Sequence, residues 1–550
     1  MLTNILPARY FFFSACVLTF IVSTLLAGIG FGWGFWILAV VGGFLSVVGT
    51  IDVVQTRQAI RRNYPVLAHL RFMLESIRPE IRQYFLEGDT EQIPYSRVQR
   101  SVVYQRAKNQ LNNRPFGTQL DVYEEHYEWL NHSIAPVEVK DHDFRIQIGS
   151  AQCSKPYQAS VFNISAMSYG ALSPNAILAL NEGAQRGGFY HDTGEGSISS
   201  YHRQHGGDLV WEIGSGYFGC RNPDGSFSAE RFAETAASDQ VKMIELKLSQ
   251  GAKPGHGGVL PGAKVNDIIA DARGVPVGVD CISPSTHSRF NTPIELLEFI
   301  AQLRELSGGK PTGFKLAIGH PWEWFSLAKA MLKTEIYPDF IVVDGGEGGT
   351  GAAPLEFSDH VGAPLSEGLM LVHNTLVGIG KRNDIRIGAA GKIVTAFDIT
   401  RVLAMGADWC NAARGFMFAL GCIQSQTCHT GHCPTGVTTQ DPLRYRALVP
   451  KDKATRVFEF HQSTLEALQE LLGAAGLVHP DQLGPEHVIR RISSTDVRSL
   501  ASLYRWVKPN ELISGPLPEH PVFQIFWEIA SADSFTAPPS VLANRTTRLR

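Results

Sequence analysis

The chain has 550 residues, of which 44% are hydrophobic and 18% are charged, and its formal net charge is -3 at pH 7. This length is enough for two to four average domains, or for one large barrel with additional segments. The near-neutral charge argues against a nucleic-acid partner, because there is no basic excess to neutralise phosphates.

The first predicted element is a pair of membrane-spanning helices. No charged side chain occurs over residues 10–50, a run about twice as long as one spanning helix needs. The glycine-rich GIGFGWG divides this run, which predicts a helical hairpin over residues 10–28 and 33–51. Arginines flank the run on both sides: Arg9, Arg57, Arg61 and Arg62. Both ends, and the domain that follows, are therefore expected on the cytoplasmic side of the inner (plasma) membrane. A cleaved signal peptide is the alternative, but two apolar segments without a small-x-small cleavage site argue against it.

The predicted hairpin domain covers residues 1–52, and residues 53–140 are predicted to form a helical linker and lid. VLAHLRFMLESIRPEIRQYF has apolar residues at helical spacing and ends near Gly88. NRPFGTQLDVYEEHYEWLNHS is aromatic-rich and loop-like. No catalytic pattern occurs in this part of the sequence, so we expect it to pack on the next domain.

Residues 141–450 contain short apolar runs that end in small or polar residues. The eight runs begin at Ser160, Gly188, Met243, Val277, Thr312, Phe340, Ile385 and Trp409. Amphipathic stretches such as NAILALNEGAQ and PIELLEFIAQLREL lie between most of them. Eight alternating strand–helix units predict an α/β fold, a (β/α)8 TIM barrel, with its site at the C-terminal ends of the strands. A doubly wound open sheet is the alternative, because it shows the same alternation.

Two features of these runs indicate a bound phosphate and a flavin. AAGK (389–392) and NAARG (411–415) follow the last two strands, where barrel proteins commonly form a phosphate site. Lys315 lies within the fifth strand, which is unusual for a barrel interior. A buried ammonium needs a partner, and a flavin ring that becomes anionic on reduction would supply one. The alternative is a lysine that points outward to solvent.

GEGGTG (346–351) fits the dinucleotide-binding pattern G-x-G-x-x-G and follows an apolar run. However, Pro354 and the polar EFSDH do not open the long helix that such a fingerprint requires. A nicotinamide site is therefore disfavoured.

Of the eight cysteines, only Cys422, Cys428 and Cys433 are close together, with the spacing C-x5-C-x4-C. The low cysteine density favours a reducing compartment over a secreted disulfide scaffold. Four thiolates complete a zinc site or an iron–sulfur cube, so three leave the site open. A zinc site completed by His429 or His432, or three reduced thiols, are alternatives. Residues 451–550 are predicted to form a helical extension, with helices in FEFHQSTLEALQELLGAAG and VRSLASLYRWV, and a polar tail.

Over about residues 140–450 the sequence resembles the FMN-binding synthase domain of glutamate synthase. The motifs are SAMSYGALS, TGEG, QGAKPGHGGVLPG, DGGEGGTGAAPLE and CIQSQTCHTGHCPTGVTTQDP, in this order. The N-terminal hairpin, EIRQYF and RPFGTQLDVYEEHYEWLNHS are similar to the short, stand-alone branch of that family.

The resemblance implies two cofactors, FMN and a [3Fe–4S] cluster. The implied cluster ligands, in the loop 422–433, are Cys422, Cys428 and Cys433. The implied flavin-binding residues are Ala166, Met167, Ser168, Gln250, Gly346 and Gly349, with Lys315 near the N1/O2 edge of the ring. The implied phosphate-binding residues are Gly391, Ala413 and Arg414.

The resemblance also implies a reaction, the reductive amination of 2-oxoglutarate to L-glutamate through a 2-imino acid. Lys253 and Arg273 match the substrate-binding cations of the family, and Glu195 matches its acidic residue near the flavin. Lys253 and Glu195 are therefore the implied catalytic residues. The alternatives are a surface-paired arginine at Arg273 and a structural turn carboxylate at Glu195.

The sequence departs from the family at two positions of QGAKPGHGGVLPG. His256 and Val259 stand where the family usually has an acidic residue and a glutamine. This leaves open a different oxo acid, imino acid or amine, or a non-catalytic membrane electron-transfer module. No glutaminase, β-helix or pyridine-nucleotide domain is recognisable, so we expect a separate electron donor, a ferredoxin or a reductase subunit. Ammonia is expected from solution or from a partner protein.

Overall fold

The computed structural model describes residues 8–91 and 94–536. Its contacts divide the chain into two compact units, residues 1–91 and 92–550. The division falls inside the segment predicted as a linker. The first seven residues of the predicted hairpin domain and residues 537–550 of the predicted tail lie outside the described residues.

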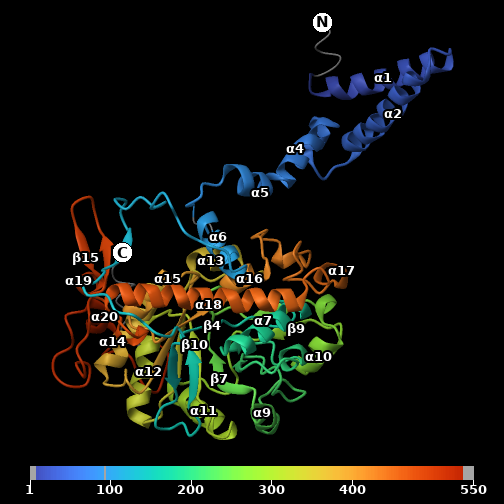
Figure 1. The fold of residues 1–550 in the computed structure, drawn as a ribbon. Coiled ribbons are helices and arrows are strands. Elements are labelled where there is room, and N and C mark those ends of the chain that lie inside the picture. Colours follow the sequence, from blue (N-terminus) through green and yellow to red (C-terminus); the bar gives the residue numbers. More distant parts are fainter. Residues whose placement is uncertain (1–7, 92–93, 537–550) are drawn as a thin grey trace, which may run out of the picture. The chain divides into compact units, whose positions relative to one another are not determined.

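The first unit begins with two apolar helices, α1 (Phe11–Gly28) and α2 (Trp33–Val54), which lie side by side (Figure 1). Both are long and apolar enough to cross a membrane, and they confirm the two predicted helices. A Cβ at Gly42 would lie 2.9 Å from the backbone nitrogen of Phe20, so the helices approach closely at a small residue. The unit continues with α3 (Ala59–Asn63), α4 (Leu67–Ser76), α5 (Arg78–Ile81) and the π-helical turn η3 (Arg82–Leu86).

The second unit is built on a closed barrel of eight parallel strands, which confirms the predicted (β/α)8 fold. In barrel order these are β4 (Phe162–Ile164), β5 (His191–Asp192), β6 (Leu209–Ile213), β7 (Val241–Lys247), β10 (Thr312–Leu316), β11 (Phe340–Asp344), β12 (Arg386–Ala390) and β13 (Trp409–Ala412). The barrel closes where β13 pairs with β4, with Ala412 opposite Ile164.

One of the eight predicted strands is wrong. The run that begins at Val277 contains β9 (Cys281–Ser283), which pairs antiparallel with β8 (Gly258–Leu260) outside the barrel. Its place in the barrel belongs to β6, which follows β5 after only a four-residue helix, α8 (Ser200–Arg203). Without a long helix in between, the strand–helix alternation did not reveal β6.

The barrel helices follow the predicted amphipathic stretches. Those in the second unit between β4 and the C-terminal segment are α7 (Pro174–Gly187), α9 (Ala229–Ala236), α10 (Asp267–Arg273), α11 (Pro293–Leu306), α12 (Pro321–Thr334), α13 (Leu355–His360), α14 (Leu365–Gly378), α15 (Ala396–Ala404), α16 (Arg414–Leu420) and α17 (Pro442–Tyr445). Helix α11 shows why they form: a Thr292–Glu295 capping box and a proline in the first turn start it. Its buried Leu296, Ile300 and Leu303 then recur on one face.

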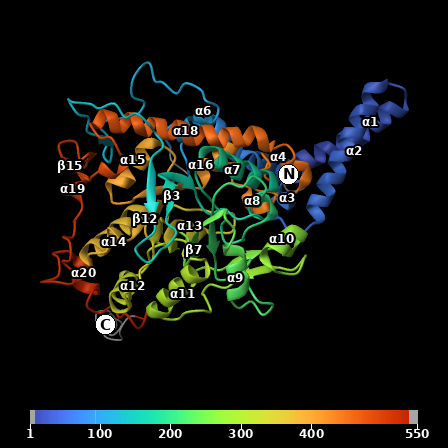
Figure 2. The same cartoon turned by 60° about the horizontal axis from the view of Figure 1, so that its bottom comes forward.

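Segments that precede the barrel in the chain and segments that follow it pack on its outside. Helix α6 (Arg97–Ala107) and the long α18 (Pro450–Ala475) pack together, and α18 also packs on α7 and α16 (Figures 1 and 2). Strand β1 (Glu128–Leu130) pairs with β14 (Val488–Arg491), which pairs with β15 (Val497–Ser499). The stretch VRSLASLYRWV, predicted as a helix, is instead β15 followed by the single turn α19 (Leu500–Leu503). The last helix is α20 (Pro521–Phe526).

The barrel interior has two layers. The hairpin of β2 (Arg145–Ile148) and β3 (Tyr157–Ser160) packs on an apolar layer that includes Val210, Met243 and Trp409. Two residues further along their strands, Glu212 and Glu245 occupy the same inward-facing positions, because side chains alternate along a strand. The apolar end therefore stabilises the barrel, and charged groups lie toward the C-terminal ends of the strands.

Candidate active site

A pocket of about 390 Å³, including its open mouth, lies at the C-terminal ends of β6 and β7. Its charged and polar side chains are Glu195, Ser215, Lys247, Ser249, Gln250, Lys253, His256 and two serines of the β8–β9 region, Ser283 and Ser285. The pocket therefore brings together three of the predicted residues, Glu195, Gln250 and Lys253. It adds Lys247 and His256, which the site prediction did not include.

Glu195 and Lys247 form an ion pair at 3.0 Å inside this pocket. Burial raises the pKa of Glu195, but Lys247, Arg273 and Lys253 together lower it to about 2. Glu195 is therefore a carboxylate at neutral pH. Lys247 could have been predicted from the sequence. Side chains alternate between the two faces of a strand, so Lys247 lies on the same inward face as Met243 and Glu245.

Lys253 is a buried cation beside this pair. Its side chain is 5% exposed, and its Nζ donates a hydrogen bond to the carbonyl oxygen of Gly257 at 2.9 Å. Burial lowers the pKa of Lys253, Glu195 raises it, and Lys247 lowers it again; the net shift is downward. A lysine with a lowered pKa gives up a proton more readily than an exposed one.

Arg273 lies behind the Glu195 loop and does not line the pocket. It is 6% exposed, so the alternative of a surface-paired arginine is wrong. Its Nη2 donates to the carbonyl oxygen of Tyr169 at 3.2 Å, and a Cβ at Gly196 would lie 3.0 Å from the same nitrogen. Within the described chain, its Nε has no hydrogen-bond partner although it is buried.

The loops after β4 and β5 interlock at the predicted flavin-binding residues. Gly194 has φ +65°, and a Cβ there would lie 2.6 Å from the backbone nitrogen of Ser168. Only glycine tolerates both the backbone conformation and this approach. Ala166 and Ser168 remain partly exposed, whereas Met167 is buried.

Two cations face each other at the predicted phosphate site. The guanidinium carbon of Arg414 lies 5.4 Å and Lys392 Nζ lies 5.9 Å from the centre of the Tyr95 ring. Burial lowers the pKa of Lys392, and Arg414 lowers it further. The predicted residues Gly391, Ala413 and Arg414 lie in these two loops, and Lys392 was missed although it ends AAGK.

The glycine-rich loop GEGGTG (346–351), which follows β11, lies beside Arg414 of the predicted phosphate site. A Cβ at Gly349 would lie 2.9 Å from Arg414 Nη1, so this glycine leaves room for the arginine. Gly346 instead donates its N–H to the carbonyl oxygen of Ala363 at 2.8 Å, which places it against the opposite loop. The structure thus brings Gly349 to the phosphate-site cations but turns Gly346 away from them.

Lys315 points into the barrel, so the alternative of an outward-facing lysine is wrong. It is 3% exposed, and its Nζ contacts Glu212 and lies 3.2 Å from Glu245 Oε2. Carboxylates of the barrel are thus partners of this ammonium, where the sequence suggested a flavin.

The three close-set cysteines lie in an irregular loop beside the glycine-rich loop. A Cβ at Gly351 would lie 3.3 Å from Cys428 Cβ, and Tyr104 donates its O–H to the carbonyl oxygen of Cys422 at 2.6 Å. Gln424 and Gln426 both have φ near +60°, a conformation that strains a residue other than glycine. Burial raises the pKa of Cys433, but hydrogen bonds to threonines outweigh it and lower the pKa to about 7.

Residues 97–478 match the model of a conserved region in glutamate synthase. The chain belongs to the glutamate synthase family. Membership confirms the predicted enzyme class, an oxidoreductase of glutamate-synthase type.

The chain is similar to the following known proteins, among others. Glutamate synthase large subunit-like protein YerD of Bacillus subtilis is 38% identical over 82% of this chain and 93% of its own length. An archaeal-type glutamate synthase [NADPH] of Thermotoga neapolitana is 36% identical, but the match spans 57% of this chain and 58% of that protein. A solved flavocytochrome b2 variant with pyruvate bound has 13% identity and a TM-score of 0.40, over 82% and 93% of the two chains.

The two departures from the family pattern have different positions in this glutamate synthase family member. His256 lines the pocket, and its Nδ1 lies 2.6 Å from the carbonyl oxygen of Gly257. Val259 does not line the pocket; it is 53% exposed and pairs with Ile282 in the β8–β9 hairpin. Of the two departures, His256 is therefore the one placed to contact a molecule in the pocket.

Proposed function

We propose that this protein is a membrane-anchored glutamate synthase that uses FMN and a [3Fe–4S] cluster. It converts 2-oxoglutarate, ammonia and reducing equivalents to L-glutamate through a 2-imino acid. The observation that carries this proposal is the convergence of Glu195, Lys247 and Lys253 in one pocket at the C-terminal ends of the barrel strands.

The residues of the barrel rim fit FMN. The neighbouring cations Lys392 and Arg414 suit a phosphate group, because Arg414 lowers the pKa of Lys392 by more than Glu347 raises it. The tight packing of Gly194 on Ser168 leaves Ala166, Ser168 and Gln250 at the rim as expected contacts of the ring. Bound FMN would supply hydride to the imine carbon of the substrate.

The pocket cations suit a dicarboxylate with an oxo group. Lys247 and Lys253 pair with the carboxylates, and Arg273 supports them from behind with its unpaired Nε. When ammonia adds to the C2 carbonyl, the former carbonyl oxygen leaves as water and needs a proton. Lys253, with its lowered pKa, supplies that proton, whereas ionised Glu195 holds Lys247 in place and attracts ammonium.

The cysteine loop fits an iron–sulfur cluster better than a single metal ion. In residues 8–91 and 94–536, the one group of three acidic, histidine or cysteine side chains with all ligand atoms within 4.8 Å of one another does not include these cysteines. A zinc ion needs its ligands closer together than a cluster does. The contact between Gly351 and Cys428 gives a short path from the cluster to the barrel rim.

The two apolar helices support the anchor on the cytoplasmic face of the membrane. Arginines follow α2 at Arg57, Arg61 and Arg62, which is the positive-inside pattern. Electrons then come from a separate donor, a ferredoxin or a reductase subunit, and ammonia comes from solution or from a supplying partner.

His256 favours a second candidate, a reaction on a different oxo or imino acid or on an amine. Its imidazole stands in place of the family's acidic residue, and it lines the pocket. A substrate whose distal group is smaller or neutral would accept this exchange.

The test is anaerobic and uses the full chain in detergent. We expect a flavin absorbance spectrum, an S = 1/2 EPR signal of the oxidised cluster, and new L-glutamate when dithionite, 2-oxoglutarate and ammonium are added. Cofactors without glutamate would favour the second candidate, and the same assay with other oxo acids and with amines then identifies the substrate. A Cys428→Ser variant is expected to lose the EPR signal, whereas Cys153→Ser keeps it. Absence of both cofactors after anaerobic reconstitution would contradict the proposal.

A further inference from the structure

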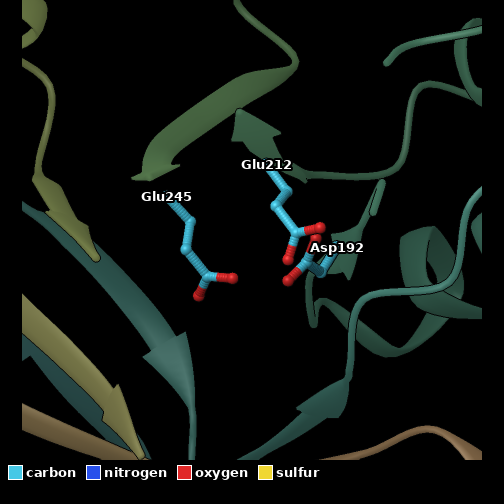
Figure 3. Close-up of side chains that lie close together, drawn as sticks. All are labelled: Asp192, Glu212 and Glu245. Atoms are coloured by element: carbon cyan, nitrogen blue, oxygen red, sulfur yellow. The ribbon is translucent and has the colours of Figure 1, made fainter. Parts of the chain in front are cut away.

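Three carboxyl groups are enclosed inside the barrel. Asp192, Glu212 and Glu245 come from the adjacent strands β5, β6 and β7, and their ligand oxygens lie within 4.8 Å of one another. Each residue is at most 2% exposed. Figure 3 shows the three carboxyl groups gathered in one interior space. We call these residues, with Lys315 and Asp344, the buried network.

Lys315 supplies positive charge to the buried network from the next strand, β10. Its ammonium contacts Glu212 and lies 3.2 Å from Glu245. Burial alone would lower the pKa of Lys315, but the four carboxyl groups raise it well above its ordinary value. The ammonium thus pairs with two of the three clustered carboxyl groups.

One ammonium cannot balance the three enclosed carboxylates Asp192, Glu212 and Glu245 in a desolvated site, so protons remain on the carboxyl groups. Burial raises the pKa of Glu245 well above its ordinary value, and Asp192 and Glu212 raise it further. Burial, followed by Glu212, raises the pKa of Asp192 to about 7. Glu245 is therefore neutral at physiological pH, and Asp192 changes its charge there.

Two members of the network hold the backbone of the pocket loops. Asp192 accepts a hydrogen bond from the N–H of Gly194 at 3.0 Å, directly before Glu195. Asp344 accepts one from the N–H of Gly251 at 2.9 Å, two residues before Lys253. Both loops that carry the proposed catalytic residues are thus attached to the same buried charges.

We propose that Asp192 and Asp344 are positioning residues that tie the loops of Glu195 and Lys253 to the buried network, and that the proton on Asp192 sets how firmly the Glu195 loop is held. When Asp192 is ionised, the hydrogen bond from Gly194 is charge-assisted and stronger than the bond to the neutral acid. The importance of the two loops for catalysis rests on the function proposed above, but their attachment to the network does not.

Tyr190 and His191, which precede Asp192 in the chain, do not change their charge near pH 7. Tyr190 bonds to Asn411 and Trp409, and burial raises its pKa well above 10, so it stays neutral. His191 faces the other side of β5, toward His202, and burial lowers its pKa to about 3. Arg414 acts on Asp344 and stays charged. Asp192 accepts the hydrogen bond from Gly194, so a change near pH 7 in the Glu195 loop is assigned to Asp192.

The experiment measures hydrogen exchange of the full chain with cofactors, at several pH values from 6 to 8. After correction for the intrinsic exchange rate, protection of residues 193–199 is expected to rise about fivefold with pH, the difference between a neutral and a charge-assisted hydrogen bond. Asp192→Asn keeps an oxygen that accepts from Gly194 but cannot take up a proton, so its protection should not change with pH. The KM for the oxo acid is expected to fall with pH in the wild type and to stay constant in Asp192→Asn.

Two further variants separate positioning from general destabilisation. Asp344→Asn is expected to alter residues 250–257 and to leave the pH dependence of residues 193–199 intact. Asp208→Asn is the matched control, because Asp208 precedes β6, the strand paired with β5, at the N-terminal end of the barrel and accepts a hydrogen bond from Tyr157. It should behave as wild type in both loops.

A pH dependence of loop 193–199 that persists in Asp192→Asn would overturn the proposal, as would constant protection in the wild type. Hydrogen exchange needs no turnover, so it tests the attachment of the loops even when no oxo acid is a substrate. An inactive enzyme with the expected exchange pattern would therefore contradict the proposed function and keep the positioning role.

Discussion

Glu195 shows how neighbouring cations decide the charge state of a single residue. Burial opposes its ionisation, yet three cations lower its pKa to about 2, against an ordinary value of 4.5. The ion pair with Lys247 at 3.0 Å is the largest of these influences. The carboxylate is therefore ionised at neutral pH and acts as an electrostatic partner of Lys247.

Replacing Glu195 by Gln should change the acid stability of the protein. A lowered folded-state pKa gives stability that is present above the unfolded value of about 4.5 and is lost as the pH falls toward 2. The wild type should lose up to about 3 kcal/mol over this range through Glu195, and Glu195→Gln should lack this part of the decline. Chemical denaturation at pH 6, 4 and 3 measures it. Equal acid sensitivity in both proteins would mean that the pair is not formed.

Replacing Lys247 by Met removes the main influence that lowers the pKa of Glu195, as well as one proposed substrate cation. We expect the KM for the oxo acid to rise at least tenfold, about 1.4 kcal/mol, and the acidic limb of the pH–rate profile to move to higher pH. Lys242→Met is the control, because Lys242 is on the same strand but faces Asp208 at 3.6 Å at the other end. A rise in KM without a shift of the acidic limb would show that Lys247 binds substrate but does not set the charge of Glu195.

At the scale of elements, the sequence predicted strands where apolar runs alternate with long helices. It failed at β6, which a four-residue helix separates from β5, and it took the β8–β9 hairpin for a barrel strand. The two segments are strands, and Val259 and Ile282 are exposed on one face of the hairpin. However, the sequence of a strand does not show which other strand it pairs with. Glu212 lies on β6. Because the sequence did not predict this strand, it did not reveal Glu212 as a carboxylate partner of Lys315.

The prediction of the site from the sequence was likewise only partly successful. The resemblance identified Glu195, Gln250 and Lys253, because these residues stand in local motifs. It did not include Lys247 or Lys392, whose roles follow from which side chains face the pocket and each other. Such contacts join separate strands, and only the folded barrel defines them.

The interlocked loops after β4 and β5 make a prediction at this scale. In Gly194→Ala, a Cβ would lie 2.6 Å from Ser168 nitrogen at φ +65°, so we expect weakened flavin binding and a loss of stability above 2 kcal/mol, about the sum of backbone strain and overlap. Gly206→Ala is the matched control, because Gly206 has φ +70° with no atom within 4 Å of the added Cβ. It should lose only about 1 kcal/mol and keep its flavin. Flavin fluorescence and denaturant titration compare the two, and equal losses would show that the contact with Ser168 is unimportant.

At the scale of the whole molecule, the chain combines a barrel unit with a unit that begins with two apolar helices. Val40 and Val54 lie on α2 and are 71% and 73% exposed. If α2 spans a bilayer, Val40→Arg places a charge near its centre and opposes insertion by about 3 kcal/mol, whereas Val54→Arg lies at the end and is tolerated. Carbonate extraction of membranes should release more Val40→Arg than Val54→Arg. Equal extraction of both variants would argue against a spanning helix.

The pairing of β1 with β14 joins residues that are far apart in the chain. Glu128 and Arg490 are 362 positions apart, and their side chains also bond. At ribosomal rates of about 5 to 20 residues per second, roughly 20 to 70 s pass between the synthesis of these two residues. During that interval, the backbone of residues 128–130 has no partner strand. Until β14 has been synthesised, this segment is therefore open to pairing with a strand of another molecule.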